Sequence, residues 1–129
     1  MTQLSGNTHP LRSTALHVAF AFVAMGGWAA FANSGHGIGA MLAAFLVQGA
    51  LSGLITLAMK RGLEAGHRRL TGWTARLLPP LISCTAIGAL LFVIHILAGT
   101  PEVIRTIAVP WTVSTLYAFV YVASLERVR

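Results

Sequence analysis

The stretch LLPPLISCTAIGALLFVIHILA, residues 77–98, contains no charged side chain. Three further apolar stretches, 14–32, 37–59 and 103–124, give the chain four segments of about 19 to 23 residues each. An α-helix rises 1.5 Å per residue, so each segment is long enough to cross the ~30 Å hydrocarbon core of a bilayer. The sequence therefore predicts an all-α integral membrane protein, a bundle of four transmembrane helices.

The composition agrees with a membrane location. Of the 129 residues, 56% are hydrophobic and only 9% are charged, whereas soluble domains carry roughly 25% charged residues. A soluble protein of this composition would expose too much apolar surface to water. Because the spans use most of the chain, we expect one transmembrane domain, 14–125, between a short polar tail, 1–13, and the C-terminal residues 126–129.

The basic residues lie almost entirely on one side of the predicted spans. The formal net charge is +6, and lysine and arginine in short loops mark the cytoplasmic face of a membrane protein. Both termini and the connection 60–76 are therefore predicted to be cytoplasmic, with two antiparallel transmembrane hairpins in a bacterial-type inner (plasma) membrane. Eight basic residues support this orientation (Arg12, Lys60, Arg61, Arg68, Arg69, Arg76, Arg127 and Arg129), and only Arg105 opposes it.

The connection 60–76 is the longest between the predicted spans. It mixes basic residues with Leu63, Leu70 and Trp73, a pattern that suits a surface-lying amphipathic turn or helix. Nucleic-acid binding is not expected, because the chain has no free basic segment with aromatic or helical recognition features. We expect contacts with anionic lipid headgroups, and so with the bilayer, from Lys60, Arg61, Arg68 and Arg69.

The second span carries a polar stripe. Gln48, Ser52 and Thr56 are spaced four apart and share one helix face, while Gly49 and Gly53 form a small-residue pair that lets another helix approach closely. A glutamine at this depth either bonds a neighbouring helix and fixes its register, or lines a path for a polar solute. On the second interpretation the path is lined by Gln48, Ser52, Thr56, Ser114 and Tyr117.

Three polar residues are predicted near the opposite membrane surface. His36, His95 and Glu102 come from separate elements and have the chemistry of a proton relay or a loose metal site. Their spacing matches no metal-binding motif, and interfacial histidines often bond only backbone groups or headgroups. Both interpretations stay open.

Three functions are compatible with these patterns. The first is an accessory or translocation component that binds a lipid, a lipid-linked precursor or a larger membrane partner. The second is a dimeric channel or facilitator for a small polar solute, and the third is a proton- or metal-linked sensor. We expect no enzyme, catalytic residue or cofactor, because the sequence has no nucleophile–base pair, histidine cluster or phosphate loop. Four short spans enclose little volume, so we expect a homo-oligomer or a larger membrane protein partner.

Overall fold

The structure, a computed structural model, describes residues 10–128, and this part of the chain is entirely helical apart from short connections. Four long helices are present, and all four are long and apolar enough to span a membrane. The predicted tail falls largely on residues 1–9, which lie outside the described residues, as does Arg129. The helices are α1 (Pro10–Ala32), α2 (Ile38–Arg69), α3 (Gly72–Leu97) and α4 (Val103–Val128), with a short 3-10 turn, η1 (Ser34–His36), between α1 and α2.

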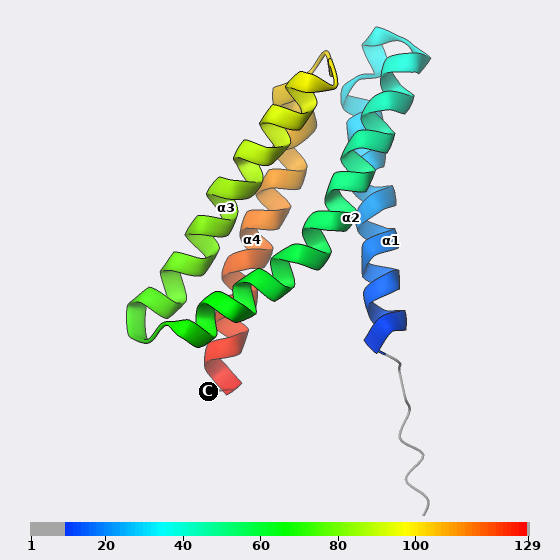
Figure 1. Cartoon of the computed structure of the whole chain (residues 1–129). Coiled ribbons are helices and arrows are strands. Elements are labelled where there is room, and N and C mark those ends of the chain that lie inside the picture. Colours follow the sequence, from blue (N-terminus) through cyan, green and yellow to red (C-terminus); the bar gives the residue numbers. More distant parts are fainter. Residues whose placement is uncertain (1–9, 129) are drawn as a thin grey trace, which may run out of the picture.

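The helices meet through α2 and α4. The connections 33–37 and 98–102 lie at one end of the molecule, here named the loop end, and the α2–α3 connection lies at the other (Figure 1). Figure 1 also shows α2 passing from α1 at the loop end towards α3 and α4. Within residues 10–128, α2 and α4 each contact the three other long helices, whereas α1 and α3 do not touch.

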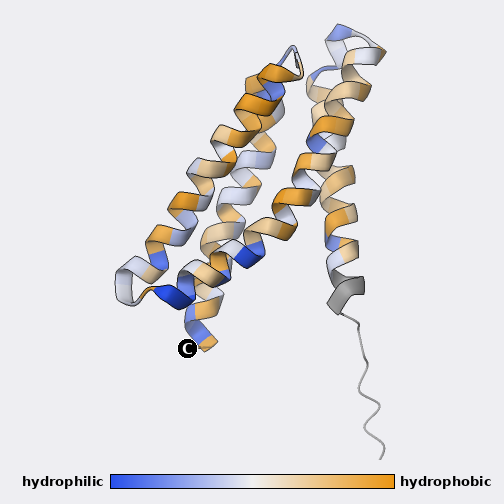
Figure 2. Cartoon of the chain, viewed as in Figure 1, coloured by the Kyte–Doolittle hydropathy of each residue, from blue (hydrophilic) through white to orange (hydrophobic). Residues whose placement is uncertain are grey.

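The apolar core is small and lies where α2, α3 and α4 meet. Most large apolar side chains instead face outwards, among them Phe20 at 73% exposed and Val120 at 68%. Figure 2 shows hydrophobic residues along all four helices and more hydrophilic colour towards the ends. This distribution suits helices surrounded by lipid tails, where outward apolar side chains carry no penalty. The core consists of Ile55, Met59, Leu63, Ile87, Leu91, Ala118 and Val122.

The segment 60–76 differs from the prediction of a long connection. The helix α2 continues to Arg69, the connection is only Leu70 and Thr71, and α3 begins at Gly72. The helix continues because Leu63 and His67, four residues apart, are buried against the bundle, while the basic residues that flank them, at 60, 61, 68 and 69, are exposed. Residues 60–69 are therefore helical, but they extend the second span and do not form a separate element, and residues 72–76 belong to α3.

Glycines allow α1 and α2 to pack closely. A Cβ at Gly26 would lie 2.9 Å from the Phe45 carbonyl oxygen, and one at Gly49 would lie 3.0 Å from the ring and the carbonyl oxygen of Phe22. At Gly53 the nearest atom, a Val18 methyl carbon, would be 3.2 Å away. The predicted pair Gly49 and Gly53 thus lies against α1, and the approach depends on the missing side chains.

Two neighbouring glycines of α1 give a matched test of this packing. We expect Gly26→Ala to destabilise the protein by about 1–3 kcal/mol, because the new methyl group pushes the two backbones apart. We expect Gly27→Ala to be neutral or slightly stabilising, because a Cβ there meets no atom within 4 Å. Thermal unfolding in detergent micelles measures both, and equal effects of the two substitutions would contradict the close contact.

Candidate functional site

A chain of buried polar side chains joins α2, α3 and the connection 98–102. Gln48 and His95 are both fully buried. The Gln48 side-chain oxygen lies 2.7 Å from His95 Nε2, and its nitrogen donates to Ser52 Oγ at 2.8 Å. An amide oxygen only accepts, so His95 carries its proton on Nε2 and its Nδ1 accepts from the Thr100 hydroxyl at 2.7 Å.

The donors in this chain of hydrogen bonds therefore all point the same way, from Thr100 through His95 and Gln48 to Ser52. Among the described residues, every buried side-chain nitrogen or oxygen has a hydrogen-bond partner. Inside a bilayer an unpaired polar group is energetically costly, because no water is present to form the missing hydrogen bond. Of the two roles predicted for Gln48, this geometry is that of a contact between helices that fixes register.

The other residues of the predicted polar path surround one pocket. Ser52, Thr56, Ser114 and Tyr117 line a pocket of about 190 Å³ between α1, α2 and α4, whereas Gln48 lies behind Ser52 and does not line it. The remaining wall comes from His17, Phe20, Ala21, Met25, Met59, Pro110 and Val113.

At the loop end, two of the three residues predicted to cluster come together. His36 Nε2 donates to a Glu102 carboxylate oxygen at 3.1 Å, and both side chains are more than one third exposed. His95 is instead bonded to Gln48 and Thr100. Residues 10–128 contain no group of three His, Cys, Asp or Glu side chains able to hold a metal ion.

Behind the His36–Glu102 pair, a buried asparagine joins α1 to α4. Asn33 Nδ2 donates to Thr106 Oγ1 at 2.7 Å, and Asn33 Oδ1 accepts from the Glu102 backbone N–H at 3.0 Å. The Trp28 indole adds a bond of 2.8 Å to the Arg105 carbonyl oxygen. These bonds hold α1 against α4 at the loop end.

The opposite end, here named the basic end, carries Lys60, Arg61, Arg68, Arg69, Arg76 and Arg127. The buried His67 donates to Glu126 at 2.6 Å, and Arg76 lies 3.4 Å from the same carboxylate, so α2, α3 and α4 are joined. The Tyr121 hydroxyl also donates to Glu64.

We did not predict roles for Glu64, His67 or Glu126 from the sequence. One signal was present: the four-residue repeat of Gln48, Ser52 and Thr56 continues through Lys60 to Glu64. Ending the second span at residue 59 concealed that repeat.

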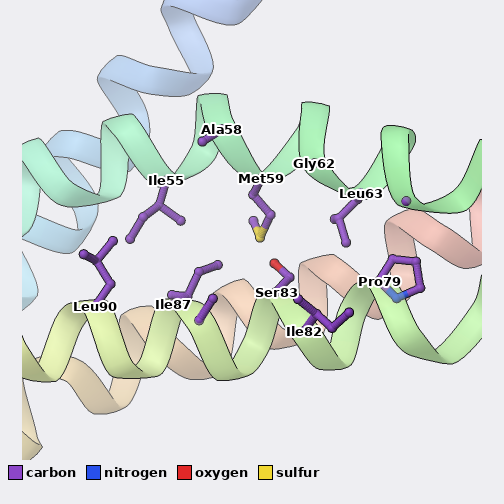
Figure 3. Close-up of a pocket in the computed structure, with 12 residues that line it drawn as sticks. Ile55, Ala58, Met59, Gly62, Leu63, Pro79, Ile82, Ser83, Ile87 and Leu90 are labelled. Atoms are coloured by element: carbon purple, nitrogen blue, oxygen red, sulfur yellow. The ribbon is translucent and has the colours of Figure 1, made fainter.

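A second, larger opening lies between α2 and α3 (Figure 3). It has a volume of about 340 Å³, and Figure 3 shows Ile55, Met59 and Leu63 of α2 facing Ile87 and Pro79 of α3 across it. One hydroxyl, that of Ser83, interrupts the apolar wall. This opening is named the α2/α3 groove, and its further lining residues are Ala58, Gly62, Gly66, Ile82, Ala86 and Leu90.

Comparisons with known proteins add no functional assignment. No protein-family model, curated protein or solved structure matches this chain. The chemistry has to be inferred from the two openings and from the charges around them.

The buried chain of hydrogen bonds leads to a prediction about the stability of the protein. Replacing Gln48 with leucine leaves the His95 N–H without an acceptor, so we expect Gln48→Leu to lower the free energy of unfolding by about 1–3 kcal/mol. Thr85→Val is the control, because the exposed Thr85 bonds only the carbonyl of Leu81 in its own helix, and we expect a change within about 0.5 kcal/mol. Unfolding in mixed micelles measures both, and a Gln48→Leu protein as stable as the control would refute the role in packing.

Proposed function

We propose that this protein is a small inner-membrane accessory or translocation component that binds an anionic lipid or lipid-linked precursor in the α2/α3 groove. Eight of the nine lysines and arginines follow the positive-inside pattern. On this basis the helices form two antiparallel hairpins, with both termini and the basic end in the cytoplasm of a bacterial-type cell. The bundle acts as a homo-oligomer or with a larger membrane protein.

The observation that carries this proposal is the placement of the groove relative to the basic end. Along α2 the groove runs from Ile55 to Gly66, which is about 16 Å at 1.5 Å per residue. That length is about half of the ~30 Å hydrocarbon core, so it matches one tail in one leaflet. The volume of about 340 Å³ also lies within the range of ligand pockets.

Arginine side chains lie at the end of the groove where a headgroup would sit. Arg69 follows Gly66 by three residues and therefore shares its helix face, and Arg76 precedes Pro79 by three. Arg76 already contacts Glu126 and the Trp73 ring, which leaves Arg69 as the better-placed cation. Arg68 is rotated from Arg69 by about 100° around α2, away from the groove.

Arg68 and Arg69 therefore provide a matched test at one depth. A cation near an anionic headgroup contributes about 1 kcal/mol, so we expect Arg69→Gln to weaken binding of a phosphatidic-acid probe about fivefold. We expect a smaller loss with Arg68→Gln. Native mass spectrometry after dilution measures the lipid that each variant retains. Equal losses of lipid in the two variants would mean that the arginines contribute only a nonspecific surface charge.

Filling the groove tests the apolar half of the site. A Cβ at Gly62 meets no atom within 4 Å although the residue lines the groove. We expect Gly62→Leu to occupy the groove and to reduce the retained lipid at least fivefold while the fold persists. Gly27→Leu is the control, because Gly27 is exposed, meets no atom within 4 Å and lies outside the groove. Unchanged retention by Gly62→Leu would exclude the α2/α3 groove as the binding site.

A further inference from the structure

The pocket between α1, α2 and α4 is a separate opening with different chemistry. Ser52 forms its floor and is only 6% exposed. Phe20 and Val113, which line the pocket, are exposed, so the pocket opens on the outer surface of the bundle. Towards the basic end α1 and α4 lie apart (Figure 1). Ala21, Ser52 and Ser114 lie near the middle of their helices, which places the pocket in the interior of the hydrocarbon core.

The pocket offers hydrogen-bond donors. Ser52 Oγ accepts from Gln48, and within residues 10–128 its own proton has no acceptor. In the described part of the chain the hydroxyls of Ser114 and Tyr117 also have no hydrogen-bond partner, and the Tyr117 ring is held by stacking on Tyr121 at 5.4 Å. Each bond of the chain from Thr100 polarises the next, which strengthens the final donor at Ser52.

The ligand that suits these donors is uncharged. Among the described residues that line the pocket there is no Asp, Glu, Lys or Arg, and His17 is the one imidazole. A charged group would lose its hydration there without a counter-ion, which is costly in hydrocarbon. An uncharged carbonyl oxygen instead accepts from hydroxyl groups.

Depth and size narrow the ligand further. Ester carbonyls of glycerolipids lie at the edge of the hydrocarbon core, about 15 Å from its middle, so they do not reach Ser52. The volume of about 190 Å³ is smaller than that of ordinary drug-sized pockets, so it admits a single ring while an attached tail stays among the lipids. A lipid-soluble quinone meets these requirements, because it joins a neutral ring that carries carbonyl groups to a hydrocarbon tail.

We propose that the α1/α2/α4 pocket binds the ring of a lipid-soluble quinone, with a ring carbonyl accepting from the Ser52 hydroxyl. Ser114 and Tyr117 are positioned for the second polar group of the ring. The pocket is distinct from the proposed lipid groove, because it lies between α1, α2 and α4 and shares only Met59 with the described residues that line the groove.

The test uses the full-length protein in nanodiscs of zwitterionic lipid, with a decyl-substituted benzoquinone as the probe. We expect saturable binding that Ser52→Ala weakens about three- to tenfold, the effect of one hydrogen bond. Ser34→Ala is the control, because Ser34 is exposed at the loop end and we expect it to leave the affinity unchanged. Equal affinities of the wild type and Ser52→Ala, or binding that does not saturate, would overturn the assignment.

A second variant controls for the structural effect that Ser52→Ala has on Gln48, whose side chain donates to Ser52. Ala21→Leu narrows the pocket and leaves the buried polar chain intact, so we expect it to reduce quinone binding while the unfolding temperature stays near that of the wild type. Decanol serves as a competitor that is neutral but lacks a carbonyl group. Displacement of the quinone by equimolar decanol, or quinone binding unaffected by Ala21→Leu, would refute a carbonyl-specific site.

Discussion

The structure depends on the need to pair polar groups where lipid, not water, is the solvent. Gln48 lies in the first half of α2 and is fully buried, so both ends of its amide must find partners within the chain. His95 and Ser52 supply them, and the histidine in turn bonds Thr100 beyond the end of α3. The rotation of α2, the register of α3 and the position of the α3–α4 connection are therefore set by one continuous chain of hydrogen bonds.

Apolar side chains do not define the arrangement to the same extent. Lipid tails solvate leucine as well as another helix does, so helices associate where close approach or hydrogen bonding gives more stabilisation than contact with lipid. Close approach occurs at Gly26 and Gly49, and hydrogen bonding closes the loop end at Asn33 and the basic end at Glu126. The bonds of Asn33 join α1 to α4 at the loop end, and the pocket between α1, α2 and α4 lies farther along the bundle.

The four spans were predictable because the thickness of a bilayer imposes a length that local sequence must satisfy. The end of α2 was not predictable in this way, because charged residues at 60 and 61 indicate the end of a span by composition alone. Long basic side chains can extend outwards from a helix whose other face, at Leu63, is buried. The shared face of Ser52 and Thr56 followed from spacing alone. Their partners did not, because the rotation of each helix is fixed by contacts distant in sequence, which is why His95 was grouped with His36.

The two openings share one side chain. Met59 lines both the α2/α3 groove and the α1/α2/α4 pocket, and it also belongs to the apolar core. Methionine has an unbranched, adaptable side chain, so its rotamer sets how the space around α2 is divided between the two sides. Any ligand that prefers one rotamer changes the room left for the other ligand, and by linkage the effect is the same in both directions. The helix α2 thus both fixes the bundle through its hydrogen bonds and forms a wall that the two proposed sites have in common.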